Sequence, residues 1–295
     1  MSRPPFSVTS TTRLAMVSAA LVWTCAAAST LANEVRIDVR DAERCIVSNG
    51  LPAHATGTFP NPGNPGRVSE QNHRFCIPAK PARRADATPL SGTTAIALNG
   101  VLIRPGTADF YDAGASRGFS RNGDRRCRLE GMGNADALGM DRNNAHTDPR
   151  GIYHYHGVPH GLVANRDGTH IAYAADGFEI HRVPGRRASY RLKTGIRPYG
   201  PTRRYDGICE TDWEYAAGSG DLDRCNGGLL NGRYVYFVTD SFPFWPRCAF
   251  GDVSADFRRG PGGGGDAQRH RERRGRHGKR HHHGHGHPPP PRHRD

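Results

Sequence analysis

The chain has almost no stretch with the 3.6-residue periodicity of an amphipathic helix, and this constrains its fold more than any other feature. Its apolar residues fall instead in short alternating, branched or aromatic runs, separated by glycine, proline and asparagine. The runs that predict strands are 34–40, 74–78, 93–103, 171–180, 189–192 and 232–239. The sequence therefore predicts a mostly-β, loop-rich single domain, similar to a β-sandwich.

Two polar stretches separate the expected strands. Residues 59–66 are so rich in proline, glycine and asparagine that we expect an ordered loop without regular structure. Residues 104–145 are also loop-like, with room for a short helix within 134–138. Within the run 93–103, Asn99-Gly100 suits a tight turn, so this run predicts two strand pieces rather than one.

Residues 1–32 have the pattern of a signal peptide. Arg3 and Arg13 precede an apolar run over 14–28, and small residues ending at Ala32 suit cleavage before Asn33. The run is short and alanine-rich for a membrane span, and no later segment approaches the necessary length. We expect a secreted or periplasmic protein whose folded domain covers 33–257.

Six cysteines follow the expected cleavage site: Cys45, Cys76, Cys127, Cys209, Cys225 and Cys248. An even number in an exported chain favours disulfides over thiolate metal ligands, and the lack of a CxxC motif argues against a zinc ribbon or a thioredoxin-type site. The spacing does not select a full pairing. Cys225–Cys248 is our first choice because it would close a hairpin-like segment.

The net charge of +13 belongs mainly to the C-terminal segment 258–295. Eleven Lys or Arg residues stand there against three acidic ones, together with half of the sixteen histidines and a four-proline run. With almost no apolar residues, this segment is predicted to be a disordered tail. Three roles stay open: collecting metal ions through 281–287, holding acidic envelope polymers or nucleic acid, or solubilising the chain.

The segment 153–156, Tyr-His-Tyr-His, alternates strictly. On a strand, Tyr153 and Tyr155 would share one face, while His154 and His156 would share the other, close enough to converge on one cation. A turn at Pro149-Arg150-Gly151 would bring His146 back beside them. Histidines without available thiolates suit Cu(II) or Zn(II), so the sequence predicts a transition-metal site here.

Further side chains are candidates for completing this site. His54 and His160 are the additional ligand candidates. Asp141, Asp176 and Asp223 are candidates for a carboxylate ligand or for a hydrogen-bond acceptor that fixes the tautomer of a ligating histidine. Tyr153 and Tyr155 are further candidates for residues that hold the ligating histidines in place through hydrogen bonds. For each aspartate, capping a turn is the more common role. A calcium site from Asp221, Asp223 and Asn226 is a weaker alternative, because their spacing is not that of an EF-hand.

Several blocks together resemble the YHYH family of exported proteins, over about residues 45–251. The blocks are Asn49-Gly50-Leu51-Pro52 with His54, Asn99-Gly100-Val101, Leu138-Gly139-Met140-Asp141, Ala145-His146, Gly151-Ile152-Tyr153-His154-Tyr155-His156-Gly157, Ala175-Asp176-Gly177-Phe178, Asp221-Leu222-Asp223-Arg224-Cys225-Asn226-Gly227, Tyr234-Val235-Tyr236-Phe237 and Phe242-Pro243-Phe244-Trp245-Pro246-Arg247-Cys248. The chain departs from the family pattern at Glu179, at His181 and at Gly228-Leu229-Leu230. The resemblance implies that the YHYH strand lies in a globular domain, and it implies no particular reaction.

Two other functions compete with simple metal binding. A three-histidine zinc site leaves an open position for water, which would permit hydrolysis with Asp176 or Glu179 as general base. The chain has neither HExxH nor GxSxG. The third interpretation is a non-catalytic cell-envelope or extracellular interaction module, with aromatic side chains of 242–246 stacking on a sugar or a protein partner.

Overall fold

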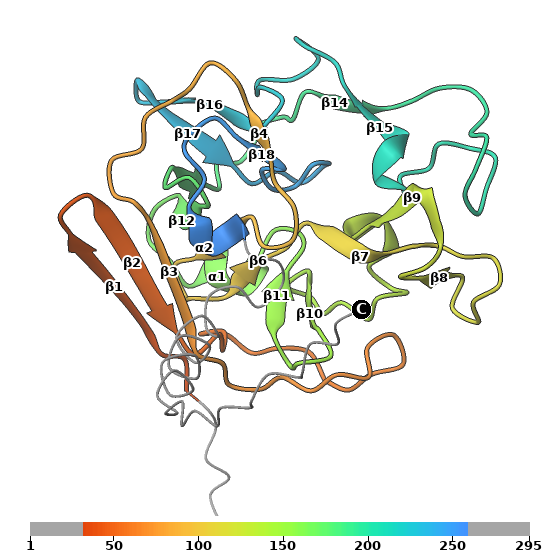
Figure 1. The fold of residues 1–295 in the computed structure, drawn as a ribbon, viewed down its shortest axis with the longest axis horizontal. Helices are drawn as coiled ribbons and strands as arrows, with labels where there is room; N and C mark the ends of the chain where they lie inside the picture. Colours follow the sequence, from red (N-terminus) through yellow and green to blue (C-terminus); the bar gives the residue numbers. More distant parts are fainter. Residues whose placement is uncertain (1–31, 259–295) are drawn as a thin grey trace, which may run out of the picture. The chain divides into compact units, whose positions relative to one another are not determined.

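The computed structural model describes residues 32–258, and these form a mostly-β fold with several sheets, as predicted (Figure 1). The predictions of a signal peptide and of a C-terminal tail fall on residues 1–31 and 259–295, which lie outside the described residues. The strands are β1 (Val35–Arg40), β2 (Glu43–Ser48), β3 (His73–Pro78), β4 (Thr88–Pro89), β5 (Ala95–Ala97), β6 (Leu102–Ile103), β7 (Gly106–Tyr111), β8 (Phe119–Ser120), β9 (Asp124–Glu130), β10 (Ala145–Thr147), β11 (Tyr153–Tyr155), β12 (His170–Ala174), β13 (Glu179–His181), β14 (Tyr190–Leu192), β15 (Trp213–Tyr215), β16 (Gly227–Leu230), β17 (Arg233–Phe237) and β18 (Cys248–Ala249). The helices are short: α1 (His160–Ala164), α2 (Ala255–Arg258), and the 3₁₀ turns η1 (Met132–Asn134) and η2 (Glu210–Asp212).

An eight-stranded mixed sheet forms the centre, in the order β10-β11-β6-β5-β12-β13-β17-β16. The pairs β11/β6 and β13/β17 are parallel, and the other neighbours are antiparallel. The hairpin β5–β6 turns at Asn99-Gly100, as the sequence predicts, and Gly100 has a φ of +78° that favours glycine there. This sheet carries the YHYH strand near one end.

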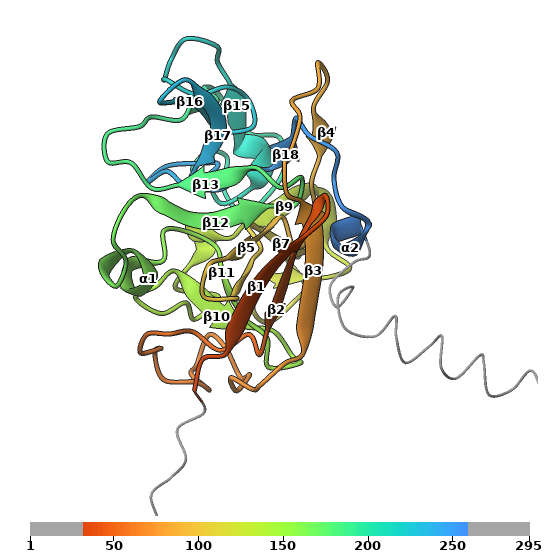
Figure 2. The ribbon, with the colours of Figure 1, turned by 90° about the vertical axis from the view of Figure 1, so that its left-hand side faces the viewer.

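The two faces of the central sheet are covered by different layers. On one face, Ile96 and Leu102 pack against Ile46, Phe75 and Ile77 of the three-stranded sheet β1-β2-β3, beside helix α2 (Figure 2). The other face carries the larger core cluster, which contains both tyrosines of the YHYH segment and the fully buried Trp245. Two sheets that share an apolar layer give the sandwich-like arrangement expected from the sequence.

The stretch 104–145 corrects our loop prediction. It contains the three-stranded antiparallel sheet β8-β7-β9 (Figure 1). The 3₁₀ turn η1 follows at Met132–Asn134, and the range 134–138, where a short helix was possible, continues as turns. The prediction failed because β9 reads Asp-Arg-Arg-Cys-Arg-Leu-Glu and buries only its last part, so it lacks an apolar alternation. Backbone pairing with β7 organises it instead.

Three disulfides link the six described cysteines: Cys45–Cys76, Cys127–Cys209 and Cys225–Cys248. The last pair confirms our first choice. Cys45 and Cys76 face each other directly across β2 and β3. Disulfides are typical of oxidising compartments, so the three pairs are consistent with an extracytoplasmic location.

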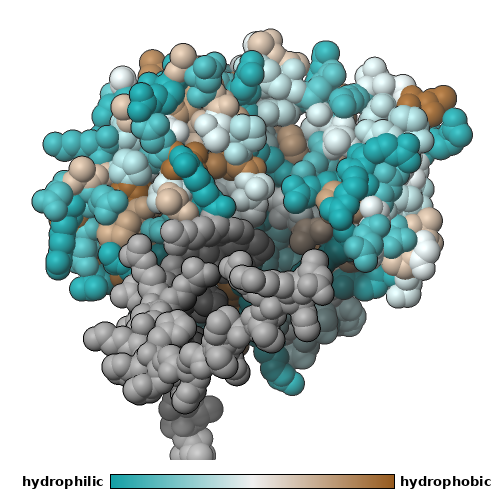
Figure 3. All heavy atoms as spheres, viewed as in Figure 1, coloured by the Kyte–Doolittle hydropathy of each residue, from teal (hydrophilic) through white to brown (hydrophobic). Residues whose placement is uncertain are grey.

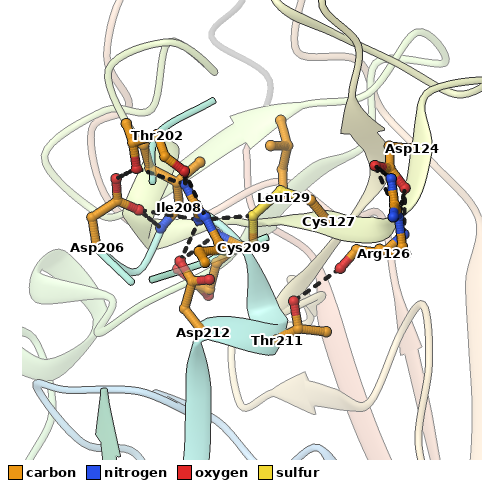
Figure 4. Close-up of a disulfide and its surroundings, with 12 residues drawn as sticks. Asp124, Arg126, Cys127, Leu129, Thr202, Asp206, Ile208, Cys209, Thr211 and Asp212 are labelled. Atoms are coloured by element: carbon orange, nitrogen blue, oxygen red, sulfur yellow. Dashed lines mark hydrogen bonds and ion pairs between the residues drawn. A yellow bond between two sulfur atoms is a disulfide. The ribbon is translucent and has the colours of Figure 1, made fainter. Parts of the chain in front are cut away.

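The Cys127–Cys209 disulfide anchors the loop-rich segment that carries β14 and β15, which pair with each other (Figure 4). Beside it, the fully buried Arg197 donates to Asp212 at 2.7 Å and lies 3.3 Å from Asp206. Two carboxylates therefore balance one buried guanidinium, which is the condition for placing such a charge inside a protein.

The described surface is mostly hydrophilic, with scattered apolar residues on the face shown in Figure 3. The large hydrophobic residues that remain exposed are Ile37, Val39, Ile196, Tyr215 and Leu229. Among residues 32–258, no helix has the length and apolar character needed to cross a bilayer.

Candidate metal centre

The hairpin β10–β11 builds the candidate site. Its antiparallel register sets His146 directly opposite His154, as the turn at 149–151 predicts. Gly151 has a φ of +78°, and a Cβ there would lie 2.1 Å from the Ser69 hydroxyl oxygen, so the turn requires glycine. The sequence between the two strands is thus short and stiff enough to fix the cross-strand histidine pair.

The predicted alternation of β11 holds in the structure. Tyr153 and Tyr155 belong to the larger core cluster, on the face away from the β1–β3 sheet. On the opposite face, His154 is registered with Leu102 of β6, which packs in the cluster shared with the β1–β3 sheet. His154 therefore shares the sheet face of Leu102, and the tyrosines lie in the core of the opposite face.

The three rings converge. Their centroids are 4.7 Å apart for His146–His154, and 4.9 Å apart for both His146–His156 and His154–His156. One ring nitrogen of each lies within 4.8 Å of those of the other two. Three such atoms all lie within about 2.8 Å of a common point, against a Zn–N bond of about 2.0–2.1 Å. Each nitrogen would therefore have to move by at most about 0.8 Å to reach bonding distance of one ion.

Backbone carbonyls determine which nitrogens are free. The His146 Nδ1 lies 2.8 Å from the Leu138 oxygen, and the His154 Nδ1 lies 2.9 Å from the Ile152 oxygen. The Asn64 amide nitrogen also lies 3.2 Å from the His146 Nδ1, but it donates to the Thr147 oxygen at 2.8 Å, and the Leu138 carbonyl is the closer partner of the ring. A carbonyl only accepts hydrogen bonds, so in both rings Nδ1 carries the proton and Nε2 keeps its lone pair. An Nδ1–H bonded to a carbonyl is the usual support for a histidine that binds metal through Nε2.

The closest contact in the cluster joins the Nε2 atoms of His146 and His156, which are 3.1 Å apart. Ligands of one tetrahedral zinc ion are separated by about 3.3 Å, so the contact has nearly the spacing of a shared cation. Without a cation, His156 must carry its proton on Nε2 and donate it to His146. Its Nδ1, which lies 3.5 Å from the Pro105 oxygen, then has nothing to donate to that carbonyl.

Burial keeps the triad neutral. Loss of hydration lowers the pKa of His146, and it lowers the pKa of His154 and His156 well below 6.5. The neighbouring histidines and Arg104 add to the effect on His154. His154 and His156 are 5% and 1% exposed, whereas His146 is half-buried and marks the side where the cluster approaches solvent. Neutral imidazoles are the form that ligates metal.

Gly131 makes room for the third histidine. A Cβ at this position would lie 2.4 Å from the His156 Nδ1 and 3.0 Å from the Pro105 oxygen. Any side chain there would displace the ring or its supporting carbonyl. No pattern in the sequence marks this glycine as part of the site.

Two of the predicted histidine ligands are not brought to the triad. His54 lies on the tyrosine side, where its Nε2 is 2.6 Å from the Tyr155 hydroxyl. His160 is exposed at the start of α1, and its Nε2 lies 3.4 Å from the Asn144 amide nitrogen. Among the described residues, the histidine group that could hold a metal consists of His146, His154 and His156.

The three candidate aspartates hold structure together elsewhere. Each accepts a hydrogen bond from a tyrosine hydroxyl at 2.7 Å: Asp141 from Tyr153, Asp176 from Tyr236, and Asp223 from Tyr234. Each also accepts from backbone N–H groups. The Nδ1 atoms of the triad are supported by carbonyls rather than by these carboxylates.

The residues considered for the alternative functions are also engaged elsewhere. Glu179 accepts from His181 at 2.9 Å on β13, four strands away from β11 in the sheet. Asp221 pairs with Arg187, Asp223 accepts from the Tyr234 hydroxyl, and the Asn226 amide donates to the Phe237 oxygen. Trp245 and Phe242 are 0% and 5% exposed, and the Trp245 indole donates to the Gly157 oxygen, so packing is their role.

A second group of side chains with metal-ligand spacing contains Glu43, Cys45 and Cys76. Both of its sulfur atoms are used in a disulfide, so this group offers no thiolate. In the described part of the chain, the histidine triad is therefore the candidate metal site.

Comparison with known proteins gives one match. No curated protein and no solved structure matches the chain significantly. The model of the YHYH protein family matches residues 74–251, a segment that contains the triad and its hairpin. With more than half of its length covered, the chain belongs to the YHYH protein family.

Proposed function

We propose that this protein binds one transition-metal ion, Zn(II) or Cu(II), through the Nε2 atoms of His146, His154 and His156. The observation that carries this proposal is the 3.1 Å approach of two Nε2 atoms in rings whose Nδ1 atoms face carbonyl oxygens. Two lone pairs at this distance repel each other unless a cation or a proton lies between them. A metal ion removes the repulsion and also engages His154.

The ligand set favours zinc or copper. Three neutral imidazoles without a thiolate suit these ions better than calcium or magnesium, which prefer oxygen ligands. Three protein ligands also leave a coordination position open, as in catalytic rather than structural zinc sites. The two general bases considered for hydrolysis, Asp176 and Glu179, accept hydrogen bonds from Tyr236 and His181 instead. Our proposal is therefore metal binding, without an assigned reaction.

The C-terminal segment complicates any measurement of metal content, because it carries eight histidines of its own. The test therefore uses a full-length chain in which these eight histidines are replaced by serine, hereafter the tail-substituted protein. The replaced positions are His270, His277, His281, His282, His283, His285, His287 and His293. Purification must avoid nickel resin.

The experiment is elemental analysis after equilibration with zinc or copper and extensive dialysis. We expect one metal ion per chain, and none in the His154→Ala/His156→Ala variant. A matched His54→Ala/His160→Ala variant should keep its metal, because these two histidines lie outside the triad. A folded tail-substituted protein that retains no metal would overturn the proposal.

A further inference from the structure

Arg104 is a buried cation next to the triad with an unused donor. It is 6% exposed and follows β6 directly. Its Nε donates to the Thr93 hydroxyl at 3.1 Å and its Nη1 donates to Asp148 at 3.0 Å. Its Nη2 is buried without a hydrogen-bond partner among the described residues. A buried guanidinium nitrogen left without a partner is costly, so an added hydrogen-bond acceptor at this nitrogen would be favourable.

The ion pair of Arg104 with Asp148 joins segments on either side of the strand that carries His154. Strand β11 lies between β10 and β6 in the sheet, and the Arg104 N–H continues the β6–β11 ladder by donating to the Tyr155 oxygen at 2.9 Å. Asp148 follows β10, on the far side of β11. The ion pair between Arg104 and Asp148 therefore crosses β11.

The crossing occurs on the histidine face. In the parallel register Leu102 faces the same side as His154, and Arg104, two residues later, faces that side again. Consistently, the positive charge of Arg104 lowers the pKa of all three triad histidines. Arg104 thus lies on the same side of the hairpin as the proposed metal ion.

The charges of this region call for an anion. A divalent ion held by three neutral histidines brings two positive charges into a buried space, and Arg104 adds a third. Asp148 supplies one negative charge, which Arg104 and Arg150 already share. An anionic ligand would balance the excess positive charge, fill the open coordination position, and satisfy the Arg104 Nη2.

We propose that Arg104 and the triad-bound metal together form a binding site for a small oxyanion, a carboxylate or a phosphate. This inference rests on the proposed metal site. One oxygen of the anion binds the metal at its open position, and another accepts a hydrogen bond from the Arg104 Nη2. Guanidinium groups are well suited to this two-point recognition of carboxylate and phosphate.

The test uses the tail-substituted protein loaded with Co(II), whose visible absorption reports on its ligands. Acetate and inorganic phosphate are added separately, and the spectral change is followed to saturation. We expect at least one of the two to bind, and Arg104→Lys to weaken that binding at least about tenfold while cobalt stays bound. Lysine keeps a charge facing Asp148, so it preserves more of the structure than Arg104→Gln, which should weaken binding similarly.

Arg247 provides the matched control. It is also close enough to lower the pKa of His156, but its Nη1 and Nη2 already donate to Glu210 and Glu130. Arg247→Lys should therefore change anion affinity by less than twofold. Cobalt-loaded protein that responds to neither anion, or that binds them equally well after the Arg104 substitutions, overturns this inference alone. Protein that binds no cobalt at the triad overturns it together with the proposed function.

Discussion

The central sheet contains two cross-strand histidine pairs, and the protein treats them differently. His146 faces His154 across β10 and β11, and His170 faces His181 across β12 and β13. The ring separations are similar, with centroids 4.7 Å apart in the first pair and 5.2 Å apart in the second. The pairs differ in what the ring nitrogens contact.

In the β12–β13 pair, the protein itself supplies the partners. The His181 ring lies 2.9 Å from both the Thr169 hydroxyl and the Glu179 carboxylate, and the His170 Nε2 lies 3.0 Å from the Ala172 oxygen. In the β10–β11 pair, carbonyls hold the Nδ1 atoms, and the His146 Nε2 faces only a third histidine. The comparison teaches that close histidines alone do not indicate a metal site, whereas converging Nε2 atoms without other partners do.

The largest expected effect is on stabilisation by zinc. Zinc at 100 times its Kd should add about 2.7 kcal/mol to the stability of the tail-substituted protein. For a domain of this size, that raises Tm by roughly 5–10 °C. The rise should vanish in His154→Ala/His156→Ala and persist in His170→Ala/His181→Ala, as thermal melts with and without zinc will show. If both variants lost the zinc-dependent rise in Tm equally, the two histidine pairs would not differ in metal binding.

The second prediction concerns acid stability. Burial, and to a lesser extent the charge of His181, lower the pKa of His170 to about 4, although Glu179 opposes them. Because the unfolded chain titrates near pH 6.5, it binds more protons than the folded chain between these values. This contribution is fully present above pH 6.5 and is lost as the pH falls towards 4, with a slope of at most about 1.4 kcal/mol per pH unit.

His170→Asn should therefore flatten the loss of stability between pH 6.5 and 4. Urea unfolding of metal-free protein at several pH values measures the slope. An unchanged slope in His170→Asn would mean that His170 is not the neutral, buried group that the structure indicates.

The next prediction separates the two faces of β11. The Tyr155 hydroxyl accepts from the buried Asn99 amide at 3.0 Å and contacts the His54 Nε2 at 2.6 Å. Tyr155→Phe leaves the Asn99 donor without this partner and should cost about 1–2 kcal/mol in urea unfolding. Metal affinity should change by less than twofold, because the metal would lie on the other face. A large drop in metal affinity in a Tyr155→Phe protein that is still fully folded would place the tyrosine within the metal site.

The smallest effect is expected at Glu179. Glu179→Gln keeps the shape of the side chain but removes its charge beside His181, and Glu179 is partly exposed. We expect a loss of about 1 kcal/mol in urea unfolding and no change in metal content. Gain of a metal ion by this variant would show that Glu179, and not the geometry, keeps the β12–β13 pair free of metal.

The sequence predicted the parts that depend on short-range periodicity. Strict alternation of Tyr153 to His156 placed tyrosines and histidines on opposite faces, and a turn-forming Pro149-Arg150-Gly151 returned His146 to their side. The pairing of Cys225 with Cys248 could also be predicted, because the two cysteines are near in sequence and close a compact segment.

What the sequence did not reveal depends on contacts between distant segments. Arg104 joins the site only because β6 pairs with β11 in parallel, a pairing that no local pattern marks. The Leu138 and Pro105 carbonyls that support His146 and His156 carry no side-chain signal at all. Conversely, His54 resembles a ligand in sequence but lies on the opposite face, where it contacts Tyr155.

The most direct test of the account is to locate the metal. Crystals of the zinc-loaded, tail-substituted protein, measured at the zinc absorption edge, give an anomalous peak at any bound ion. We predict a peak within about 2.0–2.1 Å of the Nε2 atoms of His146, His154 and His156. A zinc-saturated crystal with no peak there, and with a His156–His146 hydrogen bond in its place, would contradict the account.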